Sequence, residues 1–325
     1  MKLLRRQFFQ LLAGASALPA TAHMGRAQTY PSRVVHLVTG FAPAGGSDVV
    51  ARLIGHWLSE RLGQSFIIEN RPGAGGNIGT ESVVRASPDG YTLLLVTFAN
   101  VVNAALYEKL SFNFIRDIAP VAGLIRLPDL MAVHPSVPAN TVPEFLAYAR
   151  ANPGKITMAS AGNGSSGHLA GELLKMMADV NLVHAPYRGN GPALTDLLGG
   201  QVQLMFPTSA SSVEYVRSGK LRGLAVTGAN RLETLPDLPS VGEFVPGYEV
   251  NALYGIGATK GTPADVIDII NKETNTGLTN AKIKARFVDL GGTVIPGSPA
   301  EFGKLVAEET EKWAKVIRAA NIRAE

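Results

Sequence analysis

A glycine-rich loop between an expected strand and an expected helix constrains the fold of this chain most strongly. Residues 41–48 read FAPAGGSD and follow an apolar run at residues 34–38, which is typical of a buried parallel strand. Apolar residues then recur at helical spacing as far as Leu62, and Gly63 stands where a helix C-cap glycine belongs. Free N–H groups at the start of such a helix favour a carboxylate or phosphate. One loop of this kind is equally compatible with an ordinary strand-to-helix turn.

The chain repeats this arrangement. Residues 160–168 read SAGNGSSGH, again after an expected strand and before a helical pattern, and they contain G-x-G-x-x-G. A dinucleotide site also needs an acid at the end of the next strand, but residues 185–188 read APYR, so we reject a dinucleotide. Exposed N–H groups and serine hydroxyls that hold an anion remain. A third glycine-rich stretch, residues 69–79 (ENRPGAGGNIG), has no phosphate-loop lysine in register, and we expect it to define a backbone path.

Strand-like and helix-like segments alternate along the whole chain, which predicts an α/β fold. Proline at the first helical position predicts helices that begin near residues 263 and 299, and a capping-box pattern predicts one after Thr141. The expected strands are residues 34–38, 67–69, 91–97, 130–133, 156–159, 182–185, 202–206 and 221–227.

Patterns of catalytic and metal-binding residues are weak. The six histidines show no metal-ligand spacing, and the nucleophile motif G-x-S-x-G is out of register at residues 164–168. An esterase that uses Ser165 or Ser166 with His168 stays open as an alternative, although no acid is placed to orient the histidine. We expect no catalytic residue, no metal and no cofactor.

Residues 1–27 read as an export signal: a basic start, an apolar run and small residues at the end. Arg5-Arg6-Gln7-Phe8 is typical of the twin-arginine type. We expect cleavage after Ala27, with Ala22 as the alternative. The signal holds four cations and no acid, so of 30 Lys and Arg the remainder holds 26, equal to its 26 Asp and Glu. A net charge of zero gives no support to nucleic-acid binding, and the absence of cysteine excludes disulfides and a lipid anchor on an N-terminal cysteine.

Several motifs, in order along the chain, resemble the Bug (Bordetella uptake gene) solute-binding proteins of tripartite tricarboxylate transporters. They are residues 41–48 and 69–79 given above, then PDGYT at 88–92, PYRG at 186–189, ALTDLLGGQ at 193–201 and GKLRGLAVT at 219–227. The similarity runs from about residue 30 to the C-terminus.

The resemblance implies a two-lobed periplasmic binding protein of type II, with a ligand cleft between two α/β domains joined by two crossing segments. Residues 28–127 plus 251–325 would form domain 1 and residues 128–250 domain 2, with crossings at residues 125–131 and 248–253. The ligand would be a small carboxylate, such as a di- or tricarboxylate, an acidic amino acid or an aromatic acid. The protein would deliver this ligand to the membrane components of the transporter. It would be a periplasmic monomer, and it would be neither an enzyme nor lipid-anchored.

The expected ligand-binding residues lie in the loops that match the family's ligand contacts. Several of them also stand at helix starts, where free N–H groups favour an anion. The expected residues are Phe41, Ala42, Gly45, Gly46, Ser47, Asp48, Thr97, Asn100, Ser160, Ala161, Gly162, Gly164, Ser165, Ser166, His168 and Thr208. A sensory protein that presents its ligand to a signalling partner would have the same fold and site, so it also stays open as an alternative function.

The signal predicts export by the twin-arginine route, with the mature protein beginning at Gln28. An Arg5→Lys/Arg6→Lys double variant should lose this export, because the route reads the arginine pair itself. N-terminal sequencing of periplasmic material from both versions is the measurement. Export of the double variant at the unchanged level would contradict the route.

Overall fold

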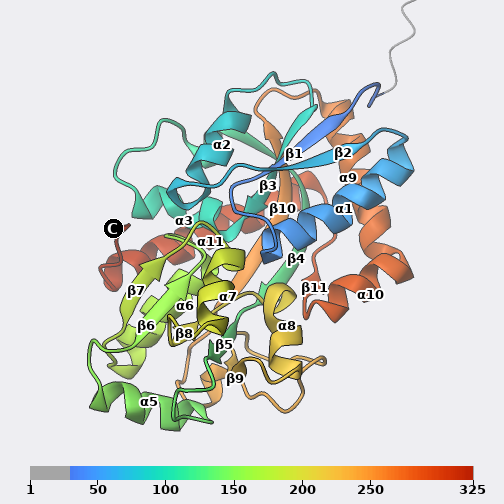
Figure 1. Cartoon of the computed structure of the whole chain (residues 1–325). Helices are drawn as coiled ribbons and strands as arrows, with labels where there is room; N and C mark the ends of the chain where they lie inside the picture. Colours follow the sequence, from blue (N-terminus) through green and yellow to red (C-terminus); the bar gives the residue numbers. More distant parts are fainter. Residues whose placement is uncertain (1–29, 325) are drawn as a thin grey trace, which may run out of the picture.

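Two β-sheets, each covered by helices, lie one above the other in the computed structural model (Figure 1). The structure describes residues 30–324, so the expected signal and its cleavage point lie outside the described residues. None of the helices in this range is long and apolar enough to cross a membrane.

The larger sheet has six strands in the order β11-β4-β10-β3-β1-β2. The chain enters it along β1, which is parallel to both β2 and β3, and β10 is antiparallel to its neighbours β3 and β4. The strands are β1 (Val35–Thr39), β2 (Phe66–Asn70), β3 (Thr92–Thr97), β4 (Ile118–Pro128), β10 (Asn251–Thr259) and β11 (Thr293–Val294). The helices that accompany them are α1 (Gly46–Leu62), η1 (Ala74–Gly76), α2 (Asn77–Val84), α3 (Phe98–Leu106), α4 (Phe114–Asp117), α9 (Ala264–Thr279), α10 (Ala281–Asp289) and α11 (Pro299–Ala319).

The smaller sheet has five strands in the order β7-β6-β8-β5-β9. Strand β6 is parallel to both of its neighbours, β7 and β8, and β5 is antiparallel to β8 and β9. The strands are β5 (Leu130–Val133), β6 (Thr157–Ser160), β7 (Val183–Pro186), β8 (Leu204–Met205) and β9 (Arg222–Val226). The helices are α5 (Val142–Ala151), α6 (Ser166–Ala178), α7 (Asn190–Leu198), α8 (Ser209–Arg217) and η2 (Val241–Glu243).

The chain crosses between the sheets twice, and hydrogen bonds tie the two crossings together. It leaves the larger sheet after β4 and returns after β9, along a segment that begins at Thr227. The hydroxyl of Thr227 accepts from the backbone N–H of Asp129 (2.8 Å) and donates to the carbonyl of Val250 (2.7 Å). The two-sheet α/β architecture is the expected one. The exact domain boundaries after residues 127 and 250 stay a prediction.

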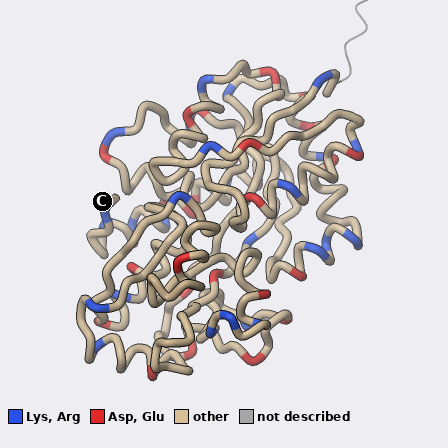
Figure 2. Tube along the Cα trace, viewed as in Figure 1, with Lys and Arg blue, Asp and Glu red and all other residues tan. Residues whose placement is uncertain are grey.

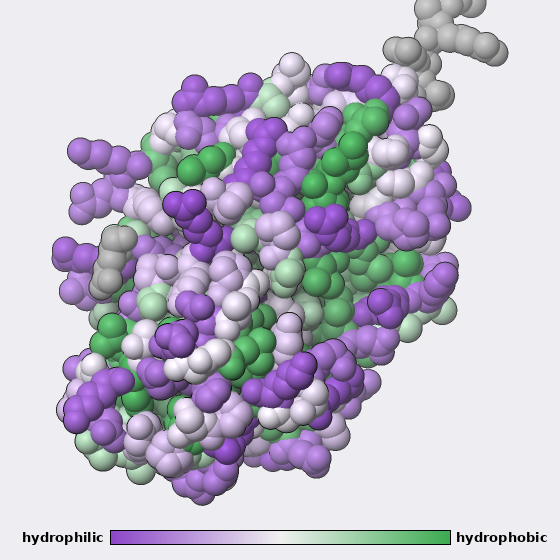
Figure 3. Space-filling model, viewed as in Figure 1, coloured by the Kyte–Doolittle hydropathy of each residue, from purple (hydrophilic) through white to green (hydrophobic). Residues whose placement is uncertain are grey.

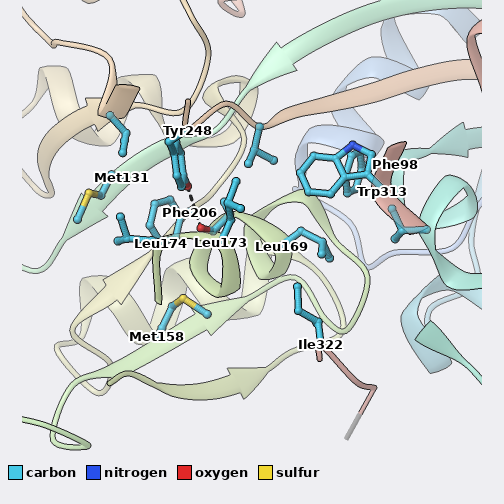
Figure 4. Packing of buried hydrophobic residues seen from close by; sticks show 14 of the residues in the cluster. Phe98, Met131, Met158, Leu169, Leu173, Leu174, Phe206, Tyr248, Trp313 and Ile322 are labelled. Atoms are coloured by element: carbon cyan, nitrogen blue, oxygen red, sulfur yellow. Dashed lines mark hydrogen bonds between the residues drawn. The ribbon is translucent and has the colours of Figure 1, made fainter. Parts of the chain in front are cut away.

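A continuous apolar core joins the helices of the two sheets (Figure 4). Phe98, at the start of α3, meets Trp313 of α11 edge to face, with ring centroids 5.0 Å apart. The same buried cluster includes Leu169 of α6 and Ile322 beyond α11. The C-terminal helix therefore packs on the larger sheet's α3 while the chain end reaches the core of the smaller sheet.

Candidate functional site

A pocket lies between the two sheets, where five helices begin. It encloses about 410 Å³ of space, including the part open to solvent. Its lining, called the pocket below, is Phe41, Gly45, Gly46, Ser47, Thr97, Phe98, Ala99, Ala161, Ser165, Ser166, Gly167, Asn190, Thr208, Ala252 and Tyr254.

Each of the five helices follows a strand directly. Helices α1 and α3 follow β1 and β3 of the larger sheet, while α6, α7 and α8 follow β6, β7 and β8 of the smaller one. In open α/β sheets the crevice outside the carboxyl ends of the strands is where ligands bind. The N-cap residues Gly45, Thr97, Ser165 and Thr208 line the pocket, as does Asn190, the first residue of α7. All five helix N-termini therefore converge on one space.

The pocket carries donors without carrying a charge. The first N–H groups of a helix have no partner within that helix, and the helix dipole adds partial positive charge at the same end. Hydroxyls of Ser, Thr and Tyr and the amide of Asn190 supply further polar groups, and Phe41 and Phe98 give an apolar wall. None of the lining residues is Lys, Arg, Asp or Glu. Elsewhere along the trace the two signs of charge are interspersed (Figure 2), and the face shown in Figure 3 mixes hydrophilic residues with several hydrophobic patches. Chemically, the pocket fits an anion with an apolar body.

Nine of the sixteen expected ligand-binding residues reach the pocket: Phe41, Gly45, Gly46, Ser47, Thr97, Ala161, Ser165, Ser166 and Thr208. The other seven lie near it and have other contacts; they are Ala42, Asp48, Asn100, Ser160, Gly162, Gly164 and His168. Six lining residues are not among the expected ones: Phe98, Ala99, Gly167, Asn190, Ala252 and Tyr254.

Asp48 holds the glycine-rich loop instead of facing the pocket. Its carboxylate accepts from the N–H of Ala44 (3.1 Å), from both arms of the Arg52 guanidinium (2.9 Å each) and from the amide of Asn70 (3.1 Å). Ala44 is in the left-handed region (φ 63°), so an acceptor for its N–H helps to fix a conformation that alanine seldom adopts. Burial raises the pKa of Asp48, but these hydrogen bonds outweigh it and hold the pKa below its usual value.

Asn100 shapes the start of α3 in a similar way. Its side-chain oxygen accepts from the N–H of Thr97 (2.7 Å), and its amide donates to the hydroxyl of Thr80 (2.7 Å). These bonds fix Thr97 at the pocket wall, so Asn100 acts through its neighbour.

His168 and His184, which pack against the loop of residues 160–168, are neutral and already hydrogen-bonded within the protein. The rings of His168 and His184 stack with centroids 4.2 Å apart. His168 accepts from the N–H of Gly164 (3.2 Å), and His184 bonds the hydroxyl of Ser160 (2.7 Å). Burial lowers the pKa of His168 to about 3 and that of His184 to about 4. Ser165 accepts from the backbone N–H of His168 (3.2 Å), and within residues 30–324 its hydroxyl makes no bond to the imidazole such as an esterase would need.

Two pocket residues that were not expected, Asn190 of the smaller sheet's α7 and Tyr254 of the larger sheet's β10, meet at Thr208. The amide of Asn190 donates to the Thr208 hydroxyl (3.1 Å), and Tyr254 also bonds it. Burial raises the pKa of Tyr254, which keeps its hydroxyl protonated. One local signal marks Asn190, namely Pro192 shortly after it, near a helix start. Tyr254 had none, because β10 was not expected as a full strand.

The two sheets' loops touch around the pocket. The N–H of Ala42 donates to the carbonyl of Arg188 (2.9 Å). A Cβ added to Gly46 would lie 2.2 Å from the Thr208 hydroxyl oxygen, and one added to Gly164 would lie 2.2 Å from the side-chain oxygen of Asn103. Both glycines are therefore needed where the two halves meet. Among residues 30–324, no cluster of His, Asp or Glu has the composition to hold a metal ion.

Known proteins resemble this chain over most of its length. Residues 50–322 match the family model described as tripartite tricarboxylate transporter family receptor. BugT of Bordetella pertussis is 31% identical over 315 residues, which cover 95% of this chain and 97% of BugT. The structure of R. palustris Rpa4515 with adipate has a TM-score of 0.88 and 35% identity, covering 90% of this chain and 99% of that one. MatC (Rpa3494) from Rhodopseudomonas palustris with bound malate has a TM-score of 0.85 and 33% identity, covering 89% and 100%. These matches confirm the resemblance that the motifs predicted.

The contacts of Asp48 predict a pH-dependent contribution to stability. Because its folded pKa lies below its unfolded value, the contribution is present above about pH 4 and is lost as the pH falls through the folded pKa. Asp48→Asn should therefore lower stability at pH 7 by about 1–2 kcal/mol, since Arg52 is half exposed. The deficit in Tm should shrink at pH 3. The matched control is Asp265→Asn, an exposed first-turn acid of α9, which should stay within about 0.5 kcal/mol of the wild type. A deficit that is equal at both pH values would contradict the role assigned to the carboxylate.

Proposed function

The chain belongs to the tripartite tricarboxylate transporter receptor family, and we propose that it captures a small carboxylate in the periplasm and delivers it to the membrane components of such a transporter. The observation that carries this proposal is the convergence of five helix N-termini on an uncharged pocket. Unpaired backbone N–H groups with a favourable dipole are a ready site for a carboxylate.

A carboxylate fits this pocket better than a cation or a neutral sugar does. A carboxylate accepts only, and the pocket offers N–H groups from both sheets together with hydroxyls such as those of Ser47 and Thr208. A cation would meet the positive ends of five helices and no acid among the lining residues. The related structures named above hold adipate and malate, both dicarboxylates. We therefore place a dicarboxylate first among the candidate ligands.

The same geometry favours binding over catalysis. The serines at the pocket are engaged as helix cap and hydrogen-bond donor, and His168 is buried and neutral. In the part of the chain that the structure describes, no carboxylate is bonded to His168, so this ring lacks the partner that orients a catalytic base. Relatives named for transport and binding support the same conclusion.

The export signal and the family together support a periplasmic location for the mature chain. Loop contacts such as the Ala42–Arg188 bond support enclosure of the ligand, because they place backbone groups of both halves against one another beside Phe41 of the pocket. Release to the membrane components would require these contacts to part.

We expect adipate and malate to raise the thermal stability of the purified mature protein. A ligand at 100 times its Kd stabilises the native state by about 2.7 kcal/mol, which raises the Tm by roughly 5 °C in a chain of this size. Adipamide is the control, because it keeps the length of adipate without its charge, and it should leave the Tm unchanged. A wider panel of carboxylates follows the same protocol. If no carboxylate in the panel raises the Tm, the proposed ligand class is wrong.

Gly164→Ala should weaken carboxylate binding at least tenfold, equal to about 1.4 kcal/mol. The added methyl would meet the side chain of Asn103, which cannot easily turn away because its amide donates to Gly75 (2.9 Å) and Asn77 (2.8 Å). Closure of the two halves would then be impeded.

The matched control for this change is Gly219→Ala. Gly219 has a similar backbone conformation (φ 70° against 80°) but open space around its Cβ position. Both variants incur the same backbone strain, so calorimetry should show weaker binding only in Gly164→Ala. Equal affinities in the two variants would contradict the proposed contact.

A further inference from the structure

Asp129 is a buried acid at the point where the chain first crosses between the sheets. Its side chain is fully buried, and its backbone is held on both sides by Thr227, whose hydroxyl accepts from its N–H and whose N–H donates to its carbonyl (2.9 Å). Asp129 also forms an isolated antiparallel bridge with Thr208 of the pocket. The acid is therefore fixed directly behind the pocket wall.

Among the described residues 30–324, the carboxyl group of Asp129 has a single hydrogen-bond partner. Oδ1 accepts from the hydroxyl of Ser166 (3.1 Å), and Oδ2 is buried with no partner. Within residues 30–324, no salt bridge reaches this carboxyl group. Burying an unpaired carboxylate is costly, so the neutral acid is favoured. Burial accordingly raises the pKa of Asp129 to about 8, although the Ser166 bond works in the opposite direction.

The other ionisable groups around Asp129 do not titrate between pH 6 and 9 or are paired elsewhere. Tyr248 and Tyr254 face it from the returning segment and from β10, and both have raised pKa values. On α6, the pKa of His168 is lowered to about 3. Along the crossings, Arg126 pairs with Glu309, Arg231 pairs with Glu243, and Glu249 accepts from Asn251. Asp129 is the group here whose charge changes in that range.

Ser166 lies between this acid and the pocket, and its hydroxyl has only one proton to donate. If Asp129 is ionised, that proton is directed to Asp129, and a ligand carboxylate would meet an oxygen lone pair with a second anion behind it. If Asp129 is protonated, its O–H can donate to Ser166, and the Ser166 proton is free for the ligand. A single hydroxyl cannot serve two carboxylates at once.

We propose that Asp129 is a proton site coupled to ligand binding: the protonated acid donates to Ser166, which in turn donates to a carboxylate oxygen of the ligand. This inference rests on the proposed function of the pocket and adds a second bound species to it. No covalent bond is made or broken apart from those to the proton, which comes from solvent. Ligand capture is then tightest when Asp129 is neutral and weakens as it ionises.

The test is calorimetry of the mature protein with adipate, and with malate as a second probe, at pH 7 and pH 9. Both ligands stay fully ionised over this range, so their own titration contributes nothing. With a pKa of about 8, the protonated fraction of Asp129 falls about tenfold between these values. The wild-type Kd should rise about tenfold, and binding at pH 9 should take up nearly one proton, measured in two buffers of different ionisation enthalpy.

Asp129→Asn separates the proton from the rest of the site, because its amide can donate to Ser166 at every pH. This variant should bind with nearly the same Kd at pH 7 and pH 9 and take up no proton. Asp117→Asn makes the same chemical change at an acid paired with Arg116 outside the pocket, and it should keep the wild-type pH dependence. A proton uptake that persists in Asp129→Asn would overturn the proposal.

Two readouts do not depend on that variant's affinity. The wild-type profile alone decides against the proposal if Kd is the same at pH 7 and pH 9. Ligand-free stability gives the second readout, because a folded pKa above the unfolded value of 3.8 means that stability is lost as the pH rises from about 4 through about 8. The Tm of Asp129→Asn minus the Tm of the wild type should therefore increase between pH 5 and pH 8. A constant difference would place the folded pKa of Asp129 at its ordinary value and overturn the proton site.

The outcomes also separate this inference from the proposed function. If neither probe nor any other carboxylate binds the wild type, the proposed function fails and the coupling fails with it. If a carboxylate binds with a flat pH profile, the proposed function stands and the coupling alone is wrong.

Discussion

Five helix N-termini point into one pocket, and the rest of the structure serves to bring them there. Two come from the larger sheet and three from the smaller, each placed by the strand that precedes it. A single helix start holds an anion weakly, because its dipole is worth about 0.3–1 kcal/mol at an exposed position. Enclosure between two halves removes water and strengthens every such interaction. The pocket can therefore bind an anion without a buried lysine or arginine.

The two segments that cross between the sheets hold together the two halves that carry these helix N-termini. Thr227 forms hydrogen bonds with both Asp129 and Val250, so it holds the two crossing segments together. This contact lies next to the pocket, because Asp129 also bonds the pocket residue Ser166. The apolar cluster that includes Phe98, Trp313 and Leu169 continues from one half to the other (Figure 4). Loop contacts beside the pocket, such as the bond from the N–H of Ala42 to the carbonyl of Arg188, also join the two halves. Residues that look like ligand contacts in the sequence, among them Asp48 and Asn100, instead fix the conformation of the loops that bear the N–H groups.

Much of this could be predicted from the sequence, because the signals are local. Apolar runs predicted β1, β3, β5 and β6, and the glycine-rich loops predicted the starts of α1 and α6. The long strand β10 could not be predicted, since Gly255 and Gly257 weaken a strand pattern. The structure gives the reason for Gly255: an added Cβ would lie 2.0 Å from the ring of Phe302, which α11 packs against the sheet. Because β10 was not predicted, its pocket residues Tyr254 and Ala252 were not predicted either. No local sequence pattern indicates that Asp129 lies behind Ser166, which is 37 residues away along the chain.

The amide proton shifts of the ¹⁵N-labelled protein on titration with adipate test the central claim most directly, because they report which N–H groups bind the carboxylate. The largest downfield shifts should fall on first-turn residues of helices from both sheets, such as Ser47 of α1 and Gly167 of α6. Shifts confined to one sheet, or adipate binding that leaves these amides unmoved, would contradict it.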